Sequence, residues 1–344
     1  MKLGGTALEF SSKYWSVKGI YEVPNIADDI PTFMGIPYAR SKEDLQGADA
    51  AIIGIPYERA PTAGRPRTSW AGWKEAPNDV RRSSLRYGGY LPELDIDILD
   101  QLRVVDYGNV AIVDDVSECF KNVMSKVSDV LDAGCVPITL GGLSGCASYA
   151  VIRAFASKCE GKVGVVSLDA HADNLDREYG PKGTQEPSSA TWQARMWDDC
   201  PNVDPRKHVE IGQRGPRMVR EQVENYLKRG CHFYPWYKVR ELGVDTVCEE
   251  MIKHAFNGVD RVWMHFDMDV IDMGTNPDWG DEPLGLSVWE VVKIAHEAGR
   301  AGLGGLSFVA IPPGSPAVGA IVTYVIDWML AGRILGGHKR TVPR

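Results

Sequence analysis

Short apolar runs recur along the chain, and each is bounded by glycine, proline or polar residues. Each run is roughly four to seven residues long, which is short for a helix but typical of a strand buried on both faces. We therefore predict strands at 51–56, 103–106, 136–140, 163–168, 208–212, 231–234, 261–267 and 304–309.

Between these runs, apolar residues repeat every three or four positions, the period of a helix with one buried face. The clearest case is 116–132, where Val123, Val127 and Val130 share one face and Gly134 provides a stop. Ser287 followed by Glu290 has capping-box spacing, which predicts a helix from there to 301. Further helices are predicted at 78–85, after Gly141, and at 216–227, 245–256 and 317–335, while 174–189 predicts a loop.

The alternation of strands with helix-length segments predicts an α/β fold. Parallel strands need helical crossovers, so the chain should form a mostly parallel sheet of about eight strands with helices on both faces. Composition does not shift along the chain, which indicates one domain over 49–344, preceded by a proline-broken arm over 1–48. Ligands of such sheets bind at the carboxyl ends of the strands.

Composition narrows the function classes. Hydrophobic content of 44%, charged content of 24% and a formal charge of −8 are those of a globular protein and argue against nucleic acid as a partner. No apolar run reaches the length of a membrane span, and the N-terminus lacks a signal-peptide core. The seven cysteines are scattered singly. We therefore expect a cytoplasmic protein without a membrane partner.

Acidic residues and a histidine follow two of the predicted strands. Asp169, His171 and Asp173 are spaced by two after the predicted strand 163–168. Asp267 ends the predicted strand 261–267, and Asp269 follows it at the same spacing. An extended backbone would put each set on one side. Carboxylates with an imidazole suit one or two divalent ions such as Mn²⁺ or Ni²⁺. The alternative is that the aspartates cap loops through local hydrogen bonds.

These two motifs resemble the signatures of the ureohydrolases, the arginase and agmatinase family, and further landmarks follow in the same order at 54–57, 105–108, 211–215 and 283–287. The resemblance implies a three-layer α/β/α sandwich that hydrolyses C–N bonds of guanidino compounds at a binuclear metal centre. It implies that Asp169 and Asp267 bridge the metals. His171 and Asp269 would complete one site, and Asp173 would serve the other.

Three positions depart from the family pattern. Ser144 stands where the resemblance implies a metal-binding histidine, and Ser188 stands near a loop histidine of the family. Ala310 replaces a glutamate that commonly pairs with the guanidinium. His265 is predicted on the same strand face as Asp267 and could replace the missing ligand. However, a buried histidine more often only forms hydrogen bonds. Metal binding by His265 is therefore the weaker interpretation.

The favoured hypothesis is a catalytically degenerate subunit, with at most partial metal occupancy, that assembles with a catalytically complete homologous subunit. The resemblance implies a hetero-oligomer, a trimer or hexamer, that acts on a guanidino or biguanide compound with Ni²⁺ or Mn²⁺. One alternative is a self-sufficient hydrolase with an altered metal centre, in which tryptophans bind an alkylated cation. A weaker alternative is a scaffold protein. The tryptophans in question are Trp70, Trp73, Trp192, Trp197 and Trp279.

Overall fold

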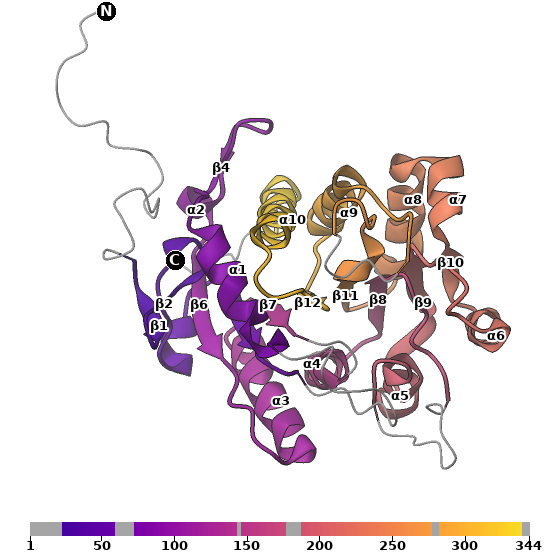
Figure 1. The fold of residues 1–344 in the computed structure, drawn as a ribbon, viewed down its shortest axis with the longest axis horizontal. Helices are drawn as coiled ribbons and strands as arrows, with labels where there is room; N and C mark the ends of the chain where they lie inside the picture. The colour runs from indigo at the N-terminus through magenta and orange to yellow at the C-terminus, as the bar shows by residue number, and fades with distance from the viewer. Residues whose placement is uncertain (1–22, 59–71, 143–145, 177–186, 277–281, 339–344) are drawn as a thin grey trace, which may run out of the picture.

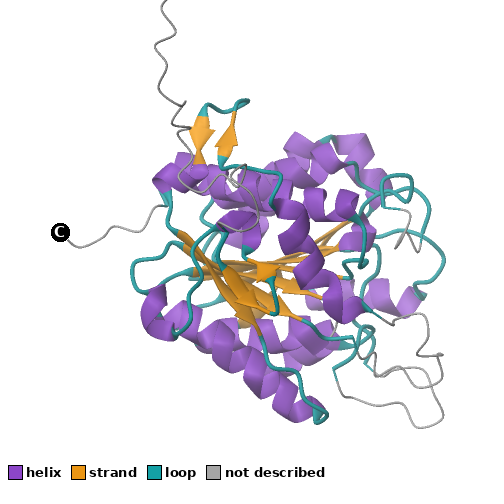
Figure 2. Ribbon diagram, turned by 60° about the vertical axis from the view of Figure 1, so that its left-hand side comes forward, coloured by secondary structure: helices purple, strands orange, loops and turns teal. Residues whose placement is uncertain are grey.

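The computed structural model describes residues 23–58, 72–142, 146–176, 187–276 and 282–338. Its centre is an eight-stranded sheet in the order β10-β9-β8-β11-β12-β7-β3-β6 (Figure 2). Every neighbouring pair is parallel, which confirms the predicted α/β class. The strands are β3 (Ala50–Ile55), β6 (Val104–Asn109), β7 (Val136–Gly141), β8 (Val163–Leu168), β9 (Val203–Ile211), β10 (His232–Tyr234), β11 (Arg261–Asp267) and β12 (Gly305–Val309).

Helices cover both faces of the sheet and give the three expected layers (Figure 1). One face carries α1 (Ala76–Ser84), α7 (Trp236–Leu242), α8 (Val244–Met251), α9 (Val288–Arg300) and α10 (Pro316–Leu335). The other face carries α3 (Val116–Asp132), α4 (Cys146–Ser157) and α5 (Trp192–Asp199). Besides short 3₁₀ and π turns, the structure contains α2 (Ile98–Gln101), α6 (Arg220–Arg229) and two small antiparallel pairs, β1 (Asn25–Ala27) with β2 (Ile30–Pro31) and β4 (Tyr90–Leu91) with β5 (Ile96–Asp97).

The two helices with the clearest sequence signals have the predicted bounds. In α3, Val123, Val127 and Val130 are buried, and Asp115 caps the first turn. In α9, Ser287 accepts a hydrogen bond from the Glu290 amide while the Glu290 side chain accepts from the Ser287 amide, which completes the capping box. Local caps and one buried face were therefore sufficient to define these helices.

Three α-helices were not predicted, the four-residue α2 and the longer α5 and α7. All residues of α5 from Trp192 to Trp197 are buried, including the polar Gln193 and Arg195, so polarity along this segment does not indicate which face is buried. Helix α7 has seven residues, Trp236–Leu242, with Pro235 as its N-cap and Gly243 as its C-cap. It is too short to show a helical period of apolar residues. Helix α5 is the more consequential omission because it contributes Trp192 to the site described below.

Helix α10 corrects one expectation. Its 20 residues are long and apolar enough to cross a membrane by length and composition, although we expected no such run. However, 67% of the most apolar window is buried inside the fold. The helix packs along α9 and against α1, so its apolar composition is accounted for by the core layer above the sheet.

A buried ion pair attaches the segment before the sheet to the fold. Arg81 of α1 donates from Nε and Nη2 to the two carboxylate oxygens of Asp106 on β6, at 2.8 and 2.9 Å, and both side chains are fully buried. Asp106 also accepts from the Phe33 amide at 2.9 Å. One carboxylate thus joins the described part of the N-terminal arm, a helix and an edge strand.

We expect Arg81→Met to lower the free energy of unfolding by about 3–5 kcal/mol, because it leaves Asp106 buried without a counter-charge. Urea denaturation measures this loss. The matched control is Arg82→Met, which removes an exposed ion pair with Asp79 from the same helix and should change stability by less than about 1 kcal/mol. Equal effects of the two substitutions would contradict the assigned role of the buried pair.

Candidate metal centre

The two acidic motifs lie side by side because β8 and β11 are neighbours in the sheet. Leu168 is level with Phe266, so the residues that follow them, Asp169 and Asp267, emerge together at the carboxyl edge. Both aspartates are buried, with exposed fractions of 0% and 4%. The position agrees with the general location of ligand sites in parallel sheets.

Asp169, His171 and Asp269 form one group that could hold a metal ion. One ligand atom from each residue lies within 4.8 Å of the others. His171 Nδ1 is 2.9 Å from Asp269 Oδ2 and 3.8 Å from Asp169 Oδ1. The Asp269 carboxylate also accepts a hydrogen bond from the Ala170 amide at 2.9 Å, which ties the two loops together. The donor set of carboxylates and imidazole fits a borderline divalent ion.

The aspartates also cap their own loops, as the alternative interpretation anticipated. Asp169 Oδ1 accepts from the His171 amide at 2.7 Å, and Asp267 Oδ1 accepts from the Asp269 amide at 3.0 Å. After Asp267 the chain forms a 3₁₀ turn, Met268–Val270, rather than continuing as a strand. Each of these carboxylates therefore uses one oxygen to fix its loop, and capping is compatible with metal binding.

Asp173 is placed differently from the other four predicted ligands. Its φ of +42° is left-handed, so the extended backbone assumed for residues 169–173 is wrong at this position. Asp173 belongs to neither group of potential ligands among the described residues. Its Oδ2 instead accepts a hydrogen bond from Trp192 Nε1 at 2.9 Å. The turn brings Asp173 near the cluster while Trp192 fixes its carboxylate.

His265 contributes to a second potential ligand group with Asp169 and Asp267. Its side chain is fully buried in β11, and its Nε2 is 3.7 Å from Asp169 Oδ2. The other ring nitrogen is 3.2 Å from Ser148 Oγ on α4. The structure therefore places His265 at the carboxylate cluster, although the sequence favoured a histidine that is only hydrogen-bonded.

Four carboxylates within this small buried region perturb one another. Burial and the neighbouring aspartates raise the pKa of Asp169 and Asp267 well above the usual range. Burial also raises the pKa of Asp173 to about 7. Asp269 is the exception: burial opposes its ionisation, but the charge and hydrogen bond of His171 lower its pKa to about 2. Two or more positive charges would relieve this repulsion, as a divalent ion does.

Arg214 holds the loop that follows β11. Its guanidinium donates to backbone carbonyl oxygens of five residues of that loop, at 2.7 to 3.3 Å. The guanidinium thereby fixes the backbone around Asp269 and adds a positive charge near the acidic cluster. The accepting residues are Asp269, Val270, Ile271, Glu282 and Pro283.

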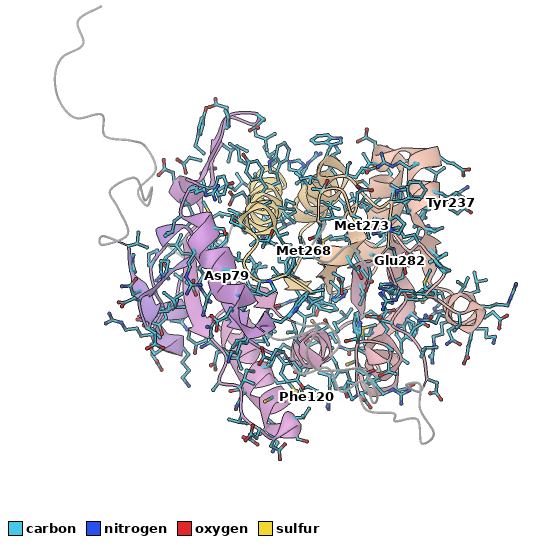
Figure 3. All side chains as sticks on the ribbon, in the orientation of Figure 1. Asp79, Phe120, Tyr237, Met268, Met273 and Glu282 are labelled. Atoms are coloured by element: carbon cyan, nitrogen blue, oxygen red, sulfur yellow. The ribbon has the colours of Figure 1, made fainter. Side chains whose placement is uncertain are left out.

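Glu282 is an acidic residue of the site that was not predicted. It is 4% exposed, its Oε1 is 3.8 Å from His171 Nε2, and Arg217 Nε lies 4.0 Å away. Glu282 lies in the segment between β11 and α9, and Met268 is the first residue of that segment. Figure 3 labels both residues. Its position directly before the 283–287 landmark was the available signal.

Two of the three positions that depart from the family pattern lie within the described residues. Ser144 lies outside the described residues. Ser188 is fully buried, and its Oγ is 3.1 Å from Thr191 Oγ1 in the turn that leads into α5. Ala310 follows β12 in a left-handed conformation, with φ of +53°, and its amide donates to the Gly142 carbonyl at 2.6 Å. Ala310 is buried and carries no charge.

The tryptophans do not form the proposed cation pocket within the described part of the chain. Trp73, Trp192 and Trp197 are all buried in the core. Trp192 packs edge-on against Trp263, and Trp197 packs in the same way against His208 and Tyr226. Trp70 and Trp279 lie outside the described residues.

A family model described as "Arginase family" matches residues 48–320. The chain belongs to the arginase family. Among its relatives, the guanidinobutyrase of Pseudomonas aeruginosa is 28% identical over 290 residues, which cover 83% of this chain and 85% of that protein. The agmatinase of Chromobacterium violaceum is 25% identical over 303 residues, which cover 86% of each protein.

Solved structures show the same arginase-family fold. The proclavaminate amidino hydrolase of Streptomyces clavuligerus superposes with a TM-score of 0.77 at 24% identity, over 89% of this chain and 98% of that one. The formiminoglutamase of Trypanosoma cruzi, solved with Mn²⁺, gives a TM-score of 0.76 at 23% identity, over 88% and 98%.

We expect Asp269→Asn to weaken Mn²⁺ binding by at least the roughly 10- to 100-fold that is typical when a group that only orients a ligand is lost. The substitution removes the charge that pairs with His171. Titration calorimetry on the metal-free protein measures the affinity. Asp272→Asn is the control, because Asp272 belongs to neither ligand group found among the described residues and its carboxylate accepts from the Gly274 amide. Unchanged affinity in Asp269→Asn would contradict the assigned ligand.

We expect Arg214→Lys to lower the free energy of unfolding by about 3 kcal/mol, because an ammonium group cannot reach all five carbonyl oxygens. Amide hydrogen exchange in residues 268–276 should become faster, as mass spectrometry can detect. The control is Arg217→Lys, since Arg217 is partly exposed and lies at the rim of the site. Unchanged exchange in that segment would show that other contacts hold the loop.

Proposed function

We propose that this chain is the supporting subunit of a heteromeric guanidino-compound hydrolase in which a complete homologous subunit carries out the reaction. The observation that supports this best is Ala310, a buried neutral residue where the family resemblance implies a guanidinium-binding glutamate. A buried cation needs a paired carboxylate to offset the loss of its hydration. A methyl group at this position cannot provide that pairing.

The metal ligands that remain support the same proposal. Asp169, His171 and Asp269 would hold one divalent ion, Ni²⁺ or Mn²⁺, and Asp267 forms a second group with Asp169. A divalent ion in such a centre lowers the pKa of a bound water and polarises the group under attack. The carboxylates position the ion, while Arg214 and the loop caps keep the carboxylates in place. Ser144 offers no imidazole, so the second metal position implied by the family resemblance would lack its usual histidine ligand.

The proposed substrate class is a guanidino or biguanide compound. Relatives named for guanidinobutyrase and agmatinase activities support the guanidino part. The sequence resembles the partner subunit of heteromeric metformin hydrolase, which favours metformin as the substrate of the complex. Addition of one water across a C–N bond of metformin gives guanylurea and dimethylamine, so the reaction balances without a further reactant.

Exposed aromatic side chains support assembly with another subunit. Trp289 on α9 and Tyr324 on α10 are 57% and 41% exposed on adjacent helices. They contact Trp328 and Tyr87 edge-on, which gives the outer helical layer several large aromatic side chains in close proximity. Aromatic residues are enriched in protein interfaces. A trimer or hexamer that pairs this chain with the complete subunit is the assembly we propose.

The test compares this chain alone, the complete homologue alone, and both co-expressed, with metformin and agmatine as substrates and Ni²⁺ or Mn²⁺ supplied. We expect turnover only with the complete subunit present and higher turnover in the complex. Asp267→Ala in this chain should leave activity of the complex largely intact, whereas the matching substitution in the partner should abolish it. Turnover by this chain alone would favour the self-sufficient hydrolase instead, and loss of activity in the Asp267→Ala complex would also reject a supporting role.

A further inference from the structure

The second ligand group, Asp169, His265 and Asp267, shares only Asp169 with the group that uses His171. One ligand atom from each residue lies within 4.8 Å of the other two. All three side chains are at least nine-tenths buried, with exposed fractions of 0%, 0% and 4%. The group uses an imidazole from within β11, two residues before Asp267, rather than from the loop after β8.

Two atoms of this group have no hydrogen-bond partner among the described residues. Asp169 Oδ2 and His265 Nε2 are buried and face each other across 3.7 Å. This separation is too long for a hydrogen bond, yet buried polar atoms nearly always have a partner. Two ligands of one ion, each about 2.0–2.1 Å from it, lie roughly 3.3 Å apart in a tetrahedral arrangement. The gap therefore fits a shared third atom, either an ion or a water.

The imidazole is held in the orientation that a ligand needs. His265 Nδ1 is 3.2 Å from Ser148 Oγ, so the nitrogen that faces Asp169 is the one left without a partner. The ring packs against Trp192 and Trp263, with ring centroids 4.5 and 5.7 Å away. Metal-binding histidines usually use their second nitrogen for such an orienting hydrogen bond. The ring is thus fixed by contacts that do not involve the carboxylates.

We propose that His265 Nε2, together with a carboxylate oxygen from each of Asp169 and Asp267, binds a borderline divalent ion such as Ni²⁺. Two carboxylates and a neutral imidazole balance the charge of the ion. His265 then supplies the imidazole that Ser144 does not. The inference concerns metal binding alone, so it holds or fails independently of whether this chain supports catalysis by a partner.

The test is calorimetric titration of the metal-free full-length chain with Ni²⁺, in a buffer without chelating groups. We expect two equivalents for the unsubstituted chain, and one for His171→Gln, which removes the imidazole of the other group. His171→Gln with His265→Gln should bind none. Thermal denaturation with and without Ni²⁺ gives a second readout, since an ion bound only to the folded state raises its melting temperature.

A milder variant keeps the test decisive if His265→Gln fails to fold. In the His171→Gln background, Ser148→Ala removes only the hydrogen bond that orients the ring and should weaken Ni²⁺ binding by about 10- to 100-fold. Ser167→Ala is the matched control. Ser167 is also a fully buried serine, it lies on β8 level with His265, and it should leave the affinity unchanged.

Three results would overturn the proposal. His171→Gln could bind no Ni²⁺, which would leave a water as the occupant of the gap. Addition of His265→Gln could leave the affinity of His171→Gln unchanged, which would place the ion elsewhere. Ser148→Ala and Ser167→Ala could have equal effects, which would show that the orienting hydrogen bond is irrelevant to binding.

Discussion

Repulsion among four buried carboxylates is the constraint around which this sheet edge is built. Asp169, Asp173, Asp267 and Asp269 perturb one another electrostatically, and burial removes most of the water that would screen them. Two side chains partly offset this repulsion: His171 pairs with Asp269, and Trp192 donates a hydrogen bond to Asp173. Loop amides bind one oxygen of each remaining aspartate. Such an arrangement favours a cation, because added positive charge stabilises every member of the cluster at once.

Most of the sheet could be predicted from sequence because its strands are buried on both faces and therefore read as continuous apolar runs. The capped helices α3 and α9 followed from local signals. The segment that became α5 gave no such signal, since the polar Gln193 and Arg195 are buried together with the apolar residues around them. Failure to predict this helix affected the prediction of the site, because Trp192, the hydrogen-bond donor to Asp173, comes from that helix.

The sequence predicted which residues form the candidate site more accurately than the backbone conformation that brings them together. The spacing of two placed Asp267 and Asp269 on one strand face, whereas a 3₁₀ turn brings them together. At Asp173 a left-handed residue replaces the extended chain. Contacts of His265 and Glu282 depend on segments distant in sequence, Ser148 on α4 and His171 after β8. Local periodicity carries no information about pairs of residues that are distant in sequence. For Glu282, the only signal was its position directly before a landmark of the family resemblance.

The order of strands divides the carboxyl edge of the sheet into two halves. The retained acidic residues follow β8 and β11, which are neighbours, and their counter-charges come from the same side of the sheet. Ala310 follows β12, and Ser144 comes shortly after β7, the neighbour of β12. Because the electrostatic balance is contained in the first half, side chains of the second half can change without unbalancing the core. A charged side chain at position 310 is therefore not needed to balance the charges of the acidic half.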